Sequence, residues 1–216
     1  MWPADFREAM LWTRATPWKA AHEVRRIASW PWIRFYLALK GVEIGHGWRL
    51  YGTPVVSRHR GSQISIGEQA EIRSWRYSNP LGVWHPCLLT TWSSEAVISI
   101  GDTFGMTGGV ICASQEIRIG RQVTVGANCT IIDTDFHPLD ATLRRSTPLG
   151  GRAAPVVIED DVFIGTEALI LRGVHIGTGA VIGARSVVTS DVPPGAFAAG
   201  NPARVLEVRP SPGSPP

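Results

Sequence analysis

The sequence predicts an all-β fold in which short strands and tight corners repeat every six residues. Aliphatic residues recur every six positions without interruption in the second half of the chain, and glycine directly follows several of them. The 216 residues also include 23 glycines and 16 prolines, which is high for a helical protein and typical of turn-rich β-architectures. A chain of this length can bury a sizeable core as one domain without disulfides.

The clearest repeat begins at Ile158. Its leading positions, each six residues apart, are Ile158, Ile164, Ile170, Ile176, Ile182 and Val188. Gly165, Gly177 and Gly183 directly follow three of them, where glycine relieves crowding or supplies a positive φ at a bend. A period of six fits neither an amphipathic helix nor an alternating strand, so it indicates short strands that each point one aliphatic side chain inward.

Less regular copies of the repeat come earlier in the chain. Ile66-Gly67 and Ile100-Gly101 carry the same pair of residues, and we expect the series to begin near Ile44-Gly45. The spacing is lost over residues 73–97 and again over residues 133–157. The second interruption shifts the frame, so the sequence predicts that residues 133–157 leave the repeat as an excursion loop.

Residues 1–41 form a separate basic and aromatic segment. Residues 1–40 contain seven Lys or Arg and three Asp or Glu, a net charge of +4, and residues 19–40 have a helical pattern that Pro31 is expected to kink or break. One interpretation is a helix that covers the open end of the solenoid, as terminal caps do. The alternative is an interfacial helix that contacts a membrane peripherally. Residues 209–216 are proline-rich and predicted to be disordered.

Composition argues against several classes of protein. Cys87, Cys112 and Cys129 form no CxxC motif, which argues against a disulfide framework and against a cysteine-built zinc site. No apolar stretch approaches the roughly 20 residues of a membrane span, and no signal-peptide pattern opens the chain. The net charge of +3 is too small to indicate nucleic-acid binding. We therefore expect a cytoplasmic protein, with peripheral membrane contact as an option.

The candidate catalytic residue is His137, where the repeat stops and residues 131–138 read IIDTDFHP. A rigid coil would fix the histidine, and the loop after it would shape a pocket. An imidazole can take a proton from a hydroxyl near neutral pH, and Asp133 and Asp135 are candidates to orient the ring or raise its basicity. The alternative is a surface turn, because Asp and Pro are common turn residues.

These motifs resemble the hexapeptide-repeat acyltransferases over roughly residues 42–208. The resemblance implies a left-handed parallel β-helix with an N-terminal helical segment and one excursion loop; the left hand comes from the resemblance, since parallel connections generally favour the right hand. The sequences VGANCTII before the loop and IEDDVFIG after it are similar to those of galactoside and maltose acetyltransferases. That similarity implies that His137 is the general base and that the acetyl group comes from acetyl-CoA.

The resemblance also implies where acetyl-CoA binds. In this family it lies in a groove between adjacent β-helices of a homotrimer, which places Thr166, Ala184, Thr189 and Arg204 at the cofactor. Arg204 belongs to AGNPARV at residues 199–205, the most specific motif in the chain, and its guanidinium suits a CoA phosphate. The alternative reading of all four positions is simply coil corners and surface.

The sequence departs from the sugar acetyltransferases at two positions. Thr107 stands where they carry an asparagine near the acceptor, and Phe163 stands where they often carry a tryptophan. Thr107 and His85, in the first irregular region, are the candidate substrate-binding residues. Three arginines make the excursion loop basic, which suits an anionic acceptor or the phosphates of CoA; a solvated loop is the alternative.

The favoured function is O-acetyl transfer from acetyl-CoA to a carbohydrate hydroxyl, in surface polysaccharide biosynthesis, because the N-terminal region and loop resemble acyltransferases of exopolysaccharide assembly. One alternative is an acetyltransferase of the same fold that acts on antibiotics or amines. Another is a non-catalytic β-helix scaffold. A zinc enzyme of the γ-carbonic anhydrase type needs three converging histidines, and beyond His137 and His175 the coils offer almost none, so no metal is expected.

Overall fold

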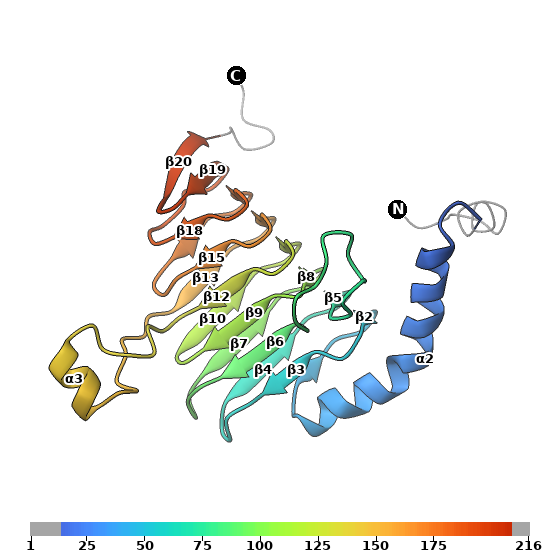
Figure 1. The fold of residues 1–216 in the computed structure, drawn as a ribbon, viewed down its shortest axis with the longest axis horizontal. Coiled ribbons are helices and arrows are strands. Elements are labelled where there is room, and N and C mark those ends of the chain that lie inside the picture. Colours follow the sequence, from blue (N-terminus) through green and yellow to red (C-terminus); the bar gives the residue numbers. More distant parts are fainter. Residues whose placement is uncertain (1–13, 209–216) are drawn as a thin grey trace.

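The computed structural model of the protein describes residues 14–208; the first 13 residues and the predicted disordered tail at 209–216 lie outside this range. The chain winds into a left-handed β-helix of three parallel sheets, which confirms the predicted fold class (Figure 1). One coil runs through one strand of each sheet, in the order sheet A, sheet B, sheet C.

The three sheets contain the following strands. Sheet A consists of β1 (Glu43–Ile44), β4 (Gln63–Ile66), β7 (Val97–Ile100), β10 (Glu116–Ile119), β13 (Val156–Ile158) and β16 (His175–Ile176). Sheet B consists of β2 (Arg49–Tyr51), β5 (Glu71–Arg73), β8 (Gly105–Thr107), β11 (Thr124–Val125), β14 (Phe163–Ile164), β17 (Val181–Ile182), β19 (Ala196–Gly200) and β20 (Ala203–Val208). Sheet C consists of β3 (Val55–Ser57), β6 (Leu88–Thr91), β9 (Val110–Ala113), β12 (Thr130–Ile132), β15 (Leu169–Ile170) and β18 (Val187–Val188). Only β20 pairs antiparallel among these described strands, against β19.

The six-residue repeat sets the register of the sheets. Every third leading aliphatic residue lies in the same sheet, so Ile158 pairs with Ile176 in sheet A and Ile164 pairs with Ile182 in sheet B. These side chains are completely or almost completely buried and fill the interior of the helix. Burying an isoleucine contributes about 1.5–3 kcal/mol, so the stacked positions are the main source of stability.

The glycines that follow the leading aliphatics serve the corners through their small size. A Cβ on Gly165 would lie 2.5 Å from the backbone nitrogen of Ala184 in the next coil, and real Cβ atoms do not approach so closely. The left-handed backbone occurs two residues further on, at non-glycine residues such as Glu167 (φ 58°) and Arg185 (φ 56°). The glycine pattern therefore reports coil-to-coil spacing, and the positive φ falls elsewhere.

Helix α2 (Pro17–Leu39) continues through Pro31, and the helix is bent along its length (Figure 1). A proline inside a helix is a common cause of such a bend. Ile33 and Leu37 on one face are fully buried in the core of the first coil, so the helix covers the N-terminal end of the solenoid. Its opposite face is exposed and includes Val24 and Phe35. Within residues 14–208, no helix has both the length and the apolar character to cross a membrane.

Two loops leave the solenoid at different corners. The predicted excursion runs over residues 133–155 between β12 and β13, contains α3 (Ala141–Ser146) and projects from the side of the β-helix (Figure 1). The structure adds a second, shorter excursion over residues 74–87, between β5 and β6. We call the turns from sheet C to sheet A the C–A corner and those from sheet B to sheet C the B–C corner. The longer loop leaves at the C–A corner and the shorter one at the B–C corner.

Candidate functional site

His137 lies at the start of the longer loop, five residues after the last residue of β12. Two backbone hydrogen bonds close the base of this loop, from Asp135 N to Arg152 O (2.9 Å) and from Gly151 N to Phe136 O (3.1 Å). Phe136 itself has a left-handed backbone (φ 57°). The position of His137 is therefore set by the paired ends of the loop as well as by the coil.

The imidazole of His137 is oriented by a backbone carbonyl. Its Nδ1 lies 2.5 Å from the carbonyl oxygen of Pro148, and the side chain is otherwise exposed. A carbonyl oxygen can only accept, so the neutral ring carries its proton on Nδ1 and presents the lone pair of Nε2 outward. This is the arrangement that a general base requires.

Asp133 has a structural position and does not orient the ring. It is completely buried, and its carboxylate accepts hydrogen bonds from the backbone nitrogens of residues 114, 115 and 116, at 2.6, 2.7 and 2.7 Å. The carboxylate thus fixes the preceding C–A corner. Sequence reasoning placed Asp133 beside His137 because the two are close along the chain, but the side chain points into the corner.

Asp135 is likewise engaged elsewhere. Its carboxylate pairs with Arg172 Nε at 2.7 Å and lies 3.9 Å from Arg152 Nε. Within residues 14–208, no hydrogen bond joins either aspartate carboxylate to the imidazole. The orienting group is the carbonyl of Pro148, which has no signal in the sequence because every residue carries a carbonyl.

Thr166 and Ala184 lie on the B–C corner, one above the other. Thr166 O accepts a hydrogen bond from Arg185 N (2.8 Å), and its hydroxyl donates to Ala127 O (2.7 Å) in the coil before. Thr189 follows β18 and is exposed on the C–A corner, whereas Arg204 is exposed on β20, opposite Ala199. The four predicted cofactor-binding residues therefore do not lie along a single corner of the β-helix.

The predicted acceptor residues, Thr107 and His85, also belong to the B–C corner. Thr107 ends β8, is nearly buried, and its hydroxyl lies 3.5 Å from Asn79 Nδ2 in the shorter loop. That loop is held by Asn128, which accepts from Trp84 N (3.1 Å) and donates to Gly82 O (3.2 Å). His85 Nδ1 lies 2.9 Å from Pro86 O. The structure thus gathers Thr107, His85, Thr166 and Ala184 along one corner and places His137 on another.

The cysteines are core residues. Burial raises the pKa of the Cys129 thiol to about 11 and that of Cys112 to about 11, and it also raises the pKa of Cys87. A neutral buried thiol is a poor nucleophile. None of the three cysteines is therefore a candidate nucleophile.

Comparisons with known proteins support the repeat and the fold. Residues 155–190 match the family described as the hexapeptide repeat of succinyl-transferase. Over 88 residues the chain is 56% identical to a 2,3,4,5-tetrahydropyridine-2,6-dicarboxylate N-acetyltransferase of Staphylococcus aureus, a match that covers 41% of this chain and 31% of that protein. The chain thus spans less than a third of the length of that relative.

Two solved structures share the fold. One is a mutant of AntD, an N-acyltransferase from Bacillus cereus, in complex with dTDP-4-amino-4,6-dideoxyglucose and coenzyme A; its TM-score is 0.61 at 16% identity, covering 82% of this chain and 89% of that one. The other is the hexapeptide-repeat-containing acetyltransferase VCA0836 of Vibrio cholerae in complex with acetyl coenzyme A. Its TM-score is 0.50 at 24% identity, and the match covers 96% of this chain and 92% of that one. These matches confirm the resemblance to hexapeptide-repeat acetyltransferases in repeat and in fold.

Proposed function

We propose that this protein is an acyltransferase that moves an acetyl group from acetyl-CoA to a hydroxyl of a carbohydrate acceptor, with His137 as general base. The observation that carries the proposal is the orientation of His137, whose Nδ1 is held by Pro148 O so that Nε2 is free to accept a proton. The names of the relatives support acyl transfer, and two structural neighbours bind coenzyme A or acetyl coenzyme A.

The transfer needs one base and no covalent enzyme intermediate. Nε2 of His137 takes the proton of the acceptor hydroxyl while its oxygen bonds to the thioester carbonyl carbon. Backbone N–H groups or a hydroxyl would stabilise the resulting oxyanion. The carbon–sulfur bond then breaks, the imidazolium returns its proton to the sulfur, and the products are an acetyl ester and free CoA thiol.

The proposed active site lies between copies of the chain. His137 is on the C–A corner, whereas Thr166 and Ala184 are on the B–C corner, with sheet C between them. A neighbouring copy that sets its B–C corner against this C–A corner would bring these residues together. We therefore include a homotrimer in the proposal, with Thr189 and Arg204 completing the acetyl-CoA groove and Thr107 and His85 facing the acceptor.

The decisive experiment is calorimetry with acetyl-CoA, followed by acetyl transfer to a panel of sugars. We expect about one site per chain, and transfer that is lost in His137→Ala. Failure to bind acetyl-CoA by a folded, trimeric protein would favour a non-catalytic scaffold and contradict the proposal.

Acetylation of an amine is the second candidate function, because two of the proteins named above are an N-acetyltransferase and an N-acyltransferase. The same base would take a proton from an ammonium group. Treating the labelled product with hydroxylamine separates the two, since an acetyl ester is cleaved and an acetyl amide is retained. Release of the label would support O-acetylation.

We also propose that the protein works in the cytoplasm and contacts a membrane peripherally through α2. The outward face of the helix exposes Val24 (70%), Trp32 (62%) and Phe35 (56%), with Arg25 and Arg34 exposed on the same helix. An apolar face with cations favours the surface of anionic lipid. Co-sedimentation with phosphatidylglycerol vesicles at low salt, and its loss at high salt, is expected; absence of sedimentation at low salt would contradict this contact.

A further inference from the structure

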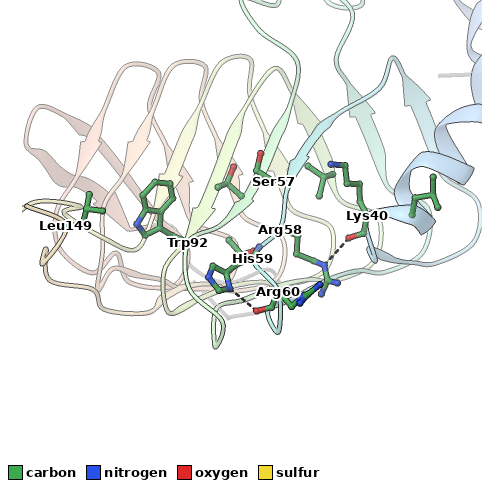
Figure 2. Close-up of a pocket in the computed structure, with 11 residues that line it drawn as sticks. Lys40, Ser57, Arg58, His59, Arg60, Trp92 and Leu149 are labelled. Carbon is green, nitrogen blue, oxygen red and sulfur yellow. Dashed lines mark hydrogen bonds between the residues drawn. The ribbon is translucent and has the colours of Figure 1, made fainter.

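A groove of about 800 Å³ opens along the C–A corner of the first coils (Figure 2). Lys40, at the end of α2, lies on one side of it, and Trp92 and Leu149 lie on the other. The turn between β3 and β4 supplies the residues between them. None of these residues has a role in the transfer proposed above.

The groove is cationic. Lys40, Arg58 and Arg60 line it together with His59, and none of the described residues that line it is acidic. Arg58 is held in place because its Nε donates to Lys40 O at 2.9 Å and its Nη1 donates to Ser62 O. Lys40 and Arg60 are exposed, and within residues 14–208 neither forms an ion pair with a carboxylate. Three cations gathered without a counter-charge favour an anion.

The groove adjoins the loop that carries His137. Trp92, on its wall, packs edge-on against Phe136, with ring centroids 5.7 Å apart, and Phe136 directly precedes His137. Leu149, on the same wall, directly follows Pro148, whose carbonyl orients the imidazole. The wall of the groove thus contacts the residue that precedes His137 and includes the residue that follows Pro148.

We propose that this groove binds a phosphate-type anionic group of the acyl acceptor and thereby directs the acceptor's hydroxyl toward His137. The inference rests on the proposed function and narrows it to phosphorylated acceptors. Arginine suits this task because its planar guanidinium can bind two phosphate oxygens at once, while Lys40 adds a compact positive charge. A sugar phosphate and a phosphate carried by a lipid share this chemistry.

The other source of phosphate near His137 is CoA itself. Thr166 and Ala184, where its binding is proposed, are on the B–C corner, and the groove is on the C–A corner. In the homotrimer these two corners of different copies would meet, so the experiment must separate acceptor phosphate from CoA phosphate.

The test uses inorganic pyrophosphate as the probe, measured by calorimetry on the full chain at low salt. We expect it to bind the wild-type protein also when CoA is saturating, and to bind about tenfold or more weakly in the double variant Lys40→Ala, Arg60→Ala. Arg58 is left intact because it fixes the corner. Arg118→Ala is the matched control, since Arg118 is 65% exposed on sheet A and pairs with Glu116; pyrophosphate should bind it as it binds the wild type.

Three results would overturn the inference: no binding, equal binding to the double variant, or displacement of pyrophosphate by CoA, which would make the groove part of the CoA site. Because the probe needs no turnover, this failure is distinct from failure of the proposed function, which acetyl-CoA binding and His137→Ala report. A second arm compares acetyl transfer to glucose 6-phosphate and glucose, and sedimentation with phosphatidylglycerol vesicles in both proteins. Preference for the sugar phosphate indicates a free phosphorylated acceptor, whereas vesicle binding lost in the double variant indicates a lipid-borne phosphate.

Discussion

The Nδ1 atom of His137 lies 2.5 Å from the carbonyl oxygen of Pro148, eleven residues further along the same loop. This contact makes the loop itself the partner that selects the tautomer of the histidine. In many sites a carboxylate does this work and also stabilises the imidazolium. Here a neutral carbonyl orients the ring, so the nearby aspartates are free for structural tasks.

Replacement of His137 should slow transfer strongly and leave cofactor binding intact. His137→Ala removes the only base we assign, and general-base catalysis typically contributes about 10²- to 10⁴-fold, so kcat should fall by that amount. The side chain is exposed, so the melting temperature should change little. Steady-state kinetics with the acetyl-CoA Kd measured alongside would check this; a variant with unimpaired kcat would refute the assigned role.

The close approach at Gly151 gives a second prediction about the same loop. A Cβ at this position would lie 2.4 Å from the backbone carbon of Phe136 and 2.6 Å from the backbone nitrogen of His137. Gly151→Ala must therefore move the histidine, and a displacement of about 1 Å can cost 10²-fold in rate. Gly105→Ala is the control, because its Cβ would meet nothing within 4 Å. Equal activities of the two variants would show that the loop does not position the base.

Asp133 should matter for stability more than for chemistry. Asp133→Ala leaves three partly buried backbone N–H groups without their acceptor, and each unsatisfied group costs about 1–3 kcal/mol. We therefore expect the free energy of unfolding to fall by about 3 kcal/mol or more. Denaturant unfolding measures this loss. Asp135→Ala, which removes an ion pair whose two side chains are 28% and 27% exposed, should cost less; a greater loss of stability in Asp135→Ala would contradict the assignment.

The sequence predicted the parts of this molecule that a repeat can encode. Ile158, Ile164 and Ile170 lie in three different sheets, because each step of six residues takes the chain to the next sheet of the β-helix. The prediction of the fold is therefore accurate wherever the six-residue spacing is kept. The sequence also indicated His137 as the candidate catalytic residue, because the repeat stops there; that role is a proposal. It did not reveal that Pro148 orients the ring or that Asp133 turns into the corner, since both depend on how a loop closes in space.

The sequence also did not reveal the cationic groove near the first coils, because this groove too depends on how distant segments meet in space. Lys40 and Arg60 are twenty residues apart, and no motif links them. They meet only because α2 ends beside the turn that follows β3. The sequence indicates that the repeat is lost over residues 73–97, but the attachment of the loop at 74–87 to Asn128 is a contact between distant residues.

The raised pKa of Cys129 predicts how the thiols behave. With a pKa of about 11, the buried thiol stays protonated well above neutral pH, so the thiolate fraction at pH 8 is small. Iodoacetamide should therefore label the native protein slowly at pH 8 and rapidly once it is unfolded. Cys129→Ala should retain activity, because direct transfer uses no acyl-enzyme; loss of activity in a folded Cys129→Ala protein would instead implicate the thiol.

The division of the site between two corners predicts complementation between inactive chains. His137→Ala lacks the base, and Ala184→Trp obstructs the proposed acetyl-CoA groove at an exposed position. Each should be inactive alone. Co-expressed in equal amounts, they should form mixed trimers in which about a quarter of the interfaces combine an intact His137 with an intact Ala184 of the neighbour.

A matched mixture makes this test quantitative. The double variant carrying both substitutions, co-expressed with the wild-type chain, should also leave about a quarter of the sites active if each site uses two chains, but about half if each site lies within one chain. Light scattering on each protein confirms that the trimer forms. If the two single variants give no activity together while the double-variant mixture retains half, His137 works with the B–C corner of its own chain, and the intersubunit site is wrong. If the two mixtures instead recover the same fraction of wild-type activity, His137 and Ala184 act from opposite sides of an interface between two chains. This is the result we expect, because sheet C separates the two corners within one chain.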